Sequence, residues 1–243
     1  MATQMVRSAH ALTDRIFYTS TALLLAAIVF AGFAPTFYMR TASLPALSTL
    51  LTVHGSLFTL WIVLLIAQTS FIAANRRTLH TRVGIAGMFL GVGMIVFGSA
   101  AAVDALRRGA APLPGVDPRT FLVVPLGDIA LFAGFLAAGF YFRRSPETHK
   151  RLMLVATMSL LGAAFGRIIP RLGVDTLVDA GPFAIFGPIV MLIAIGAAYD
   201  VATRGRVHRV YIWSAIVIAL SVPLRFAIGS SAPWLAFADG LAR

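Results

Sequence analysis

The sequence predicts an all-α fold, a polytopic membrane protein with seven transmembrane helices. Of its 243 residues, 59% are hydrophobic and only 12% are charged, and the mean hydropathy is +0.88. Soluble domains are closer to half apolar and a quarter charged. At about 20 residues per spanning helix, a chain of this length holds seven or eight spans joined by short loops. We therefore expect residues 1–243 to form a single transmembrane domain without a soluble domain.

Seven long apolar stretches mark the expected helices. They run from Ile16 to Met39, Leu47 to Ala74, Val83 to Val103, Phe121 to Phe142, Leu152 to Ile169, Pro182 to Tyr199, and Val210 to Ile228. Lipid offers no partner for a backbone amide, so each stretch is expected to form all its hydrogen bonds internally, as a helix. An odd number of spans places the two termini on opposite sides of the membrane.

The charges of the connecting segments predict the orientation. Twelve of the 20 Lys and Arg residues fall in the N-terminal segment and in the second-to-third, fourth-to-fifth and sixth-to-seventh loops. Cytoplasmic loops carry an excess of Lys and Arg, so the N-terminus is expected in the cytoplasm and the C-terminus outside. The net charge of +11 is thus a sign of membrane orientation. The expected partner is the lipid bilayer, and nucleic acid is not expected.

Residue types that are rare or missing remove several chemistries. The chain has no cysteine, which excludes disulfides and thiolate metal sites. The only lysine, Lys150, and the only glutamate, Glu147, both fall in a predicted loop. A retinal Schiff base within the helices and a carboxylate-rich metal site are therefore not expected, and we predict no metal site. No residue pattern names a catalysed reaction.

Four ionisable residues lie within the apolar stretches, where each costs on the order of 3 kcal/mol. His54 and Asp128 fall about 10 Å from the outer boundary, and Arg167 and Arg225 about 6 Å from it, at 1.5 Å per helical residue. We call these four residues the outer layer. Asp128 is expected to pair with one of the arginines, which leaves a surplus positive charge suited to a small anion or a lipid head group. The alternative for the arginines is that they extend to the outer head groups.

A basic pair followed by a histidine recurs in the three predicted cytoplasmic loops. The histidines are His80, His149 and His208, and the recurrence suggests three repeated hairpins added to one first helix. Helix N-termini with basic neighbours favour phosphate, so the histidines are predicted to contact lipid head groups. The alternative is that two of them ligate a haem b, because they share one depth. Their place among arginines at the water boundary argues against haem, and no haem absorption band is expected.

Together these features favour a protein that binds or transports a small anionic ligand or lipid head group through the outer layer. Two alternatives stay open. One is a membrane electron-transfer protein that uses haem b or quinone. The other is an accessory subunit of a larger membrane complex. The sequence does not decide whether the protein is an enzyme.

Four segments of the sequence resemble a functionally unassigned family of seven-helix bacterial inner-membrane proteins. They are GFAPTFYMR (32–40), VHGSLFTLWIVLLIAQTS (53–70), ETHKRLMLVAT (147–157) and YDVATRGRVH (199–208). The resemblance is spread along the whole chain. It implies one seven-helix unit in a bacterial cytoplasmic membrane, and it implies no reaction.

The predicted topology can be tested with C-terminal fusions. Alkaline phosphatase fused to the C-terminus should be active, because that end is expected outside the cytoplasm. A fluorescent reporter that folds only in the cytoplasm should be dark at the same position. The reverse pattern would contradict the predicted orientation.

Overall fold

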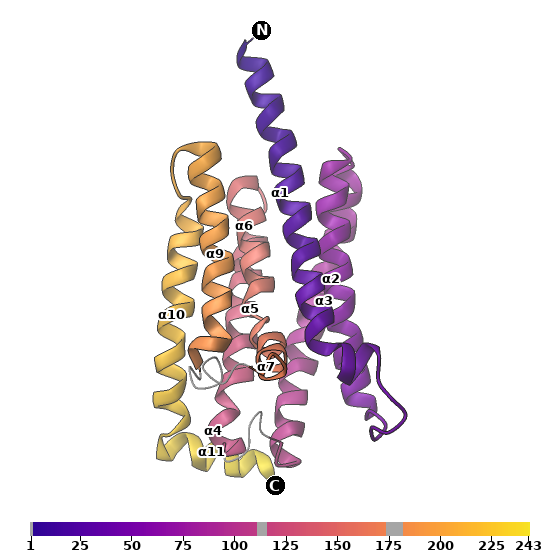
Figure 1. Cartoon of the computed structure of the whole chain (residues 1–243), viewed down its shortest axis with the longest axis vertical. Helices are drawn as coiled ribbons and strands as arrows, with labels where there is room; N and C mark the ends of the chain where they lie inside the picture. Colours follow the sequence, from indigo (N-terminus) through magenta and orange to yellow (C-terminus); the bar gives the residue numbers. More distant parts are fainter. Residues whose placement is uncertain (1, 111–115, 174–181) are drawn as a thin grey trace.

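The computed structural model describes residues 2–110, 116–173 and 182–243, which form a helical bundle (Figure 1) without any strand in these ranges. The elements are α1 (Ala2–Phe33), the π-helical turn η1 (Ala34–Tyr38), α2 (Thr49–Ala73), α3 (Arg77–Arg107), α4 (Pro118–Phe121), α5 (Val123–Tyr141), α6 (Pro146–Met158), α7 (Gly162–Arg171), α9 (Pro182–Arg204), α10 (Arg209–Gly229) and α11 (Ala232–Ala242). Within these described ranges, six helical segments are long and apolar enough to cross a membrane, and a seventh is added if α6 and α7 count as one bent span. The chain is a multi-pass helical membrane protein.

The fifth predicted span differs from the expectation of one uninterrupted helix. The helix stops after Met158, and α6 and α7 meet at an angle of 47°. At the break, Leu160 N–H donates to the Thr157 carbonyl at 3.2 Å and Leu161 N–H donates to the Met158 carbonyl at 3.0 Å. These bonds span three residues instead of four, which tightens the turn and redirects the chain. Apolar character predicts one uninterrupted span here, whereas the bent pair is either a broken span or a re-entrant loop.

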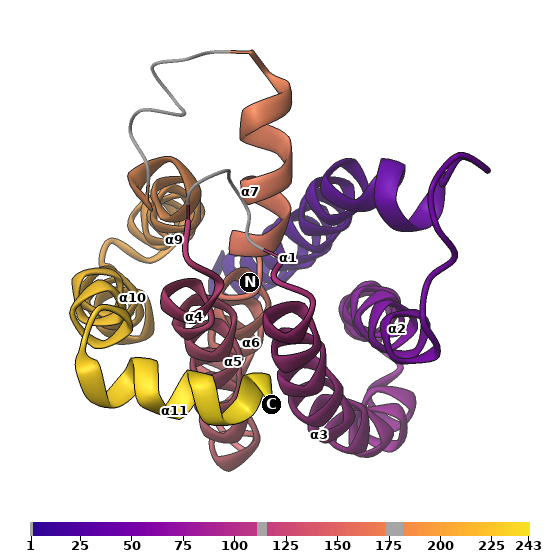
Figure 2. The same ribbon diagram turned by 90° about the horizontal axis from the view of Figure 1, so that it is seen from below.

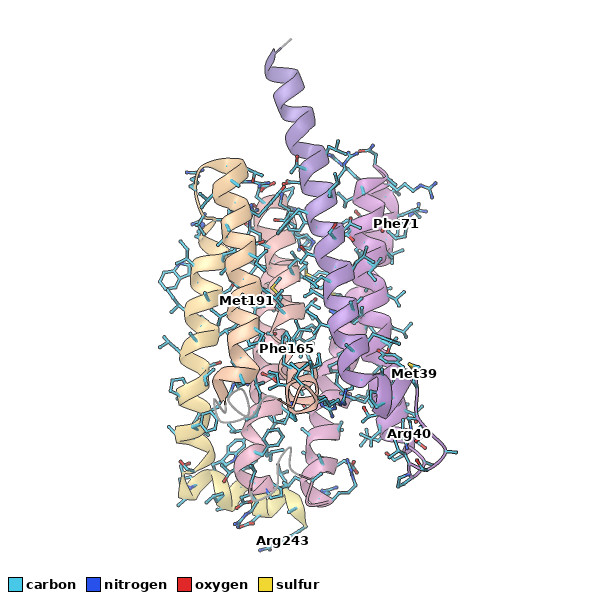
Figure 3. The ribbon with its side chains drawn as sticks, viewed as in Figure 1. Met39, Arg40, Phe71, Phe165, Met191 and Arg243 are labelled. Atoms are coloured by element: carbon cyan, nitrogen blue, oxygen red, sulfur yellow. The ribbon has the colours of Figure 1, made fainter. Side chains whose placement is uncertain are left out.

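The two ends of the bundle differ in the turns and basic residues that they carry. Figure 1 shows the N-terminus at the same end as the α2–α3, α5–α6 and α9–α10 turns. These turns hold most of the basic residues counted above, and we call this the basic end. Arg40 and Arg243 lie toward the other end (Figure 3), which we call the opposite end. The two helices of each hairpin pack against each other, and their relation as repeats stays a prediction.

Helix α6 is the centre of the bundle. Viewed along the bundle, it lies among the other helices (Figure 2). From Arg151 to Ser159, every residue except Met153 is buried. Its residues Leu154 and Val155 pack with side chains of α1, α9 and α10, whereas Ala156 packs with Trp61 and its neighbours. A short helix that begins with charged residues is therefore enclosed on nearly all sides.

Helix α11 was not predicted. It lies across the opposite end of the bundle (Figures 1 and 2). Its 11 residues are too few to span a bilayer. Trp234 Nε1 donates to the Arg119 carbonyl at 2.9 Å, and Arg119 Nη1 lies 3.2 Å from Asp239 Oδ1. These contacts attach the helix to α4.

Candidate functional site

Two residues of the outer layer, Asp128 of α5 and Arg225 of α10, form a buried ion pair. Arg225 Nη1 donates to Asp128 Oδ1 at 2.5 Å and to the Val124 carbonyl at 3.1 Å. Asp128 is 6% exposed and Arg225 4% exposed. The guanidinium also lies over the ring of Phe186, 5.1 Å from its centre. Opposite charges at this distance compensate much of each other's cost of burial.

Two glycines make room for this pair. A Cβ atom on Gly127 would lie 2.6 Å from Arg225 Nε, and one on Gly162 would lie 3.0 Å from Asp128 Oδ2. Gly162 is the first residue of α7, so the bend after α6 brings the start of α7 against Asp128. Any larger residue at Gly127 would collide with the guanidinium.

The other two residues of the outer layer lie apart from this pair. Arg167 is exposed, donates from Nη1 to the Ala163 carbonyl at 2.7 Å, and lies over the Phe33 ring at 4.5 Å. His54 is half-buried beside Phe58, and Arg167 is close enough to interact with it electrostatically. Among the described residues, Asp128 has an ion pair with Arg225 and none with Arg167. The outer layer therefore consists of two groups.

A second buried ion pair lies at the basic end and links α6 to α9. Arg151 and Asp200 are both 0% exposed. Arg151 Nε donates to Asp200 Oδ2 at 2.9 Å, and its Nη2 donates to the other carboxylate oxygen. Arg151 Nη1 also lies 2.8 Å from Glu147 Oε2. Two parallel hydrogen bonds fix the relative rotation of the two side chains as well as their distance.

This pair belongs to a larger cluster that joins three helices. We call it the basic-end ion network, and its members are Asp14, Glu147, Lys150, Arg151, Asp200 and Arg204. Asp14 of α1 lies 2.7 Å from Lys150 Nζ and 2.7 Å from Arg204 Nη2, and it accepts a hydrogen bond from Tyr199 at 2.6 Å. The sequence interpretation counted these residues only as topology signals. The sequence does contain a signal for this network. Its three acids, Asp14, Glu147 and Asp200, each occur within a few residues of a Lys or Arg at the predicted cytoplasmic side.

Two of the three histidines near the basic turns lie close together, and the third lies elsewhere. The rings of His80 and His149 lie 6.1 Å apart between centres, with their planes at 88°. His149 Nδ1 lies 2.8 Å from the Gly139 carbonyl, whereas the buried His80 Nδ1 has no hydrogen-bond partner. His208 instead caps α10, where its Nδ1 accepts the Val210 N–H at 3.3 Å. Two of the three predicted head-group contacts therefore form a pair, and the third stabilises a helix terminus.

A cavity of about 960 Å³ opens beside the histidine pair, between α1, α2, α3, α5 and α6. His80 and His149 both line it, and no residue of the outer layer does. Its apolar lining includes Trp61, Leu64, Leu65, Met88, Met153 and Leu154, and its charged lining includes Asp14, Arg15, Arg77, Arg143, Glu147 and Lys150. The cavity is therefore apolar in one part and charged in another, as an amphiphilic ligand would require.

Gln68 lines the apolar part of this cavity and lacks partners for its amide. Neither its Nε2 nor its Oε1 forms a hydrogen bond, although both atoms are buried. Buried polar groups in proteins are nearly always paired. Gln68 and His80 Nδ1 are thus polar positions in the cavity wall that a ligand or water would satisfy. The sequence interpretation did not single out Gln68 as a site residue.

The fold and these contacts define the class of protein: it is a polytopic helical membrane protein with a cavity of about 960 Å³ near its basic end. No protein-family model, curated protein or solved structure matches this chain.

The buried pair between Asp128 and Arg225 leads to a stability prediction. Asp128→Ala leaves a buried guanidinium uncompensated and should destabilise the protein by about 3–5 kcal/mol, and Asp128→Asn should cost less because it keeps a hydrogen-bond acceptor. In double-mutant cycles read by thermal unfolding in detergent, Asp128→Ala should couple to Arg225→Gln by more than about 1 kcal/mol and to Arg167→Gln by less than about 0.5 kcal/mol. Equal coupling to both arginines would contradict the observed pairing.

His208 leads to a prediction about pH. Burial, and then the charge of Arg151, lowers the pKa of His208 below its usual 6.5. Unfolding restores the usual pKa, so the unfolded chain binds the proton more readily. The free energy of unfolding should therefore fall as the pH is lowered from 6.5 through the depressed pKa. His208→Asn, which keeps a capping side chain, should show a weaker dependence of melting temperature on pH. An unchanged dependence would show that His208 does not contribute.

Proposed function

We propose that the protein binds an amphiphile with an anionic group, and that the cavity near the basic end is the binding site. The single observation behind this proposal is the pairing of an apolar lining with unpaired positive charge in a cavity of about 960 Å³. Pockets for small molecules and cofactors typically have volumes of about 300–1,000 Å³. The ligand is anionic, as expected from the sequence, but its proposed site is this cavity and not the outer layer.

The charged part of the cavity favours an anion. Arg15, Arg77 and Arg143 line it, and none of the three has a carboxylate partner among the described residues. The two acids of the lining, Asp14 and Glu147, are already bonded to cations of the basic-end ion network. Guanidinium groups bind carboxylate and phosphate through two parallel hydrogen bonds. Arg15 donates to the side-chain oxygen of Asn75, and Arg143 donates to the Phe140 carbonyl at 3.1 Å, but these neutral partners leave the positive charges uncompensated. The three guanidinium groups therefore give the charged part of the cavity a preference for negative charge.

The apolar part favours a hydrophobic body. Trp61 is 3% exposed, and its Nε1 donates to Thr157 Oγ1 at 3.1 Å, which holds the indole in place. Met88 and Met153 lie in the same lining, and their flexible thioether side chains adapt to irregular apolar shapes. By contrast, Arg225 of the outer layer is already neutralised by Asp128. We propose that this pair is structural and does not bind the anion.

Trp61 can report directly on occupancy of the cavity. A variant carrying Trp213→Phe and Trp234→Phe retains Trp61 as its only tryptophan. Dibromostearate, an anionic amphiphile whose bromine atoms quench tryptophan on contact, should quench Trp61 saturably in detergent. The methyl ester of dibromostearate, which has no charge, should quench it several-fold less well. Arg77→Gln and Arg143→Gln should each weaken quenching by the anion several-fold, because each removes a cation from the mouth.

Matched controls separate the cavity from the general lipid surface. Arg243→Gln removes a cation at the opposite end (Figure 3) and should leave the quenching of Trp61 unchanged. A second reporter variant that keeps only Trp213, which is 63% exposed, should be quenched by both the acid and its ester without saturation. If Trp213 is quenched and Trp61 is not, the cavity does not take the amphiphile and the proposal is wrong.

A further inference from the structure

The histidine pair in the cavity wall is a more specific feature than the charge at its mouth. His80 lies in the first turn of α3, and His149 lies in the first turn of α6, so two separate helices supply the rings. Both rings line the cavity. We propose that the cavity holds a b-type haem, with His80 and His149 as the two axial ligands of its iron. This inference rests on the proposed function, since it names the amphiphile that the same cavity binds.

The separation of the two rings fits one iron atom between them. A metal–imidazole nitrogen bond is about 2 Å long, and the ring centre lies about 1 Å behind the nitrogen, so two axial rings have centres about 6 Å apart. The observed separation between the ring centres of His80 and His149 is 6.1 Å. Haem in helical membrane and bundle proteins is held by side chains of facing helices. The pair therefore has the spacing that axial ligation needs before any movement of α3 or α6.

The hydrogen bond of His149 prepares its ring for ligation. A backbone carbonyl can only accept, so His149 Nδ1 carries the proton that it donates to the Gly139 carbonyl at 2.8 Å. The other ring nitrogen, Nε2, then carries the lone pair. Metal-bound histidines almost always have this arrangement, in which the second nitrogen donates to a carbonyl or carboxylate. Gly139 lies in α5, so the ring orientation is set by the α5–α6 hairpin.

The remaining donors favour a porphyrin over a bare metal ion. In the part of the chain that the structure describes, no group of three or more His, Cys, Asp or Glu residues is placed to hold a metal ion. A porphyrin brings four nitrogen ligands of its own and needs only two axial ligands. Its two propionates would suit Arg77 and Arg143, which have no carboxylate partner among the described residues, and its apolar ring would suit the lining around Trp61. The position of the histidines among arginines at the water boundary argues against haem when the sequence is taken alone. In the structure the same arginines line the cavity beside the histidines, where they would pair with the propionates.

Titration of haem into the purified full chain tests the inference. Ferric protoporphyrin IX added to the protein in detergent should bind with one equivalent and give a six-coordinate low-spin spectrum, with a sharp Soret band and a distinct α band after reduction by dithionite. His80→Ala and His149→Ala should each abolish the low-spin spectrum and weaken binding at least tenfold. Imidazole added to His149→Gly should restore the low-spin spectrum, because it replaces the missing ligand.

The control variant is His208→Asn, which changes a histidine of the same end that does not line the cavity. It should bind haem as the unmodified protein does. A low-spin spectrum that survives both His80→Ala and His149→Ala would overturn the inference. The quenching of Trp61 by dibromostearate separates this failure from failure of the proposed function. If quenching persists in the unmodified protein and no low-spin complex forms, the cavity binds amphiphiles and haem is not among them. If both signals are absent, the inference and the proposed function both fail.

Discussion

The buried ion pair between Arg151 and Asp200 is the interaction on which the rest of the bundle depends. Both side chains are fully buried, and two hydrogen bonds join them between α6 and α9. Removing either partner would leave a charge in the bundle interior, which is far more costly than leaving it in water. Asp200 also accepts the His208 N–H at 3.1 Å, so the same carboxylate holds the turn that begins α10. The pair thereby fixes the position of α6 relative to α9 and to the start of α10.

The position of α6 then determines both the histidine pair in the cavity and the packing around the buried pair of Asp128 and Arg225. At its basic end, the first turn carries His149 toward α3 and the cavity. At its other end, the break after Met158 turns the chain by 47° and places Gly162 against Asp128. The cavity and the buried pair therefore lie near opposite ends of one central, buried helix. A shift of α6 along its axis would change the spacing of the histidine pair and the packing around Asp128 together.

The two ends use charge differently. At the opposite end, Arg225 is neutralised by Asp128 and enclosed by protein. At the basic end, three acids are shared within the ion network, and Arg15, Arg77 and Arg143 stay without a carboxylate partner. An anionic ligand gains most beside these guanidinium groups, because it does not have to displace a carboxylate from them. We therefore propose the binding site at the basic end because its arginines lack carboxylate partners, and not because of how deeply they are buried.

Composition and apolar length alone were enough to predict a helical multi-pass membrane protein, because lipid forces every spanning backbone into internal hydrogen bonds. They also located the spans, singled out Asp128 and Arg225, and identified the histidines near the basic turns. Only the tertiary structure showed that Arg225 rather than Arg167 faces Asp128, that His80 and His149 come together while His208 caps α10, and that the fifth span is broken. Depth along a helix can be counted from the sequence, whereas rotation about the helix axis and the choice of neighbours depend on packing between distant segments. The cavity also depends on packing between distant segments, because five helices supply its lining and no local sequence pattern determines their relative positions.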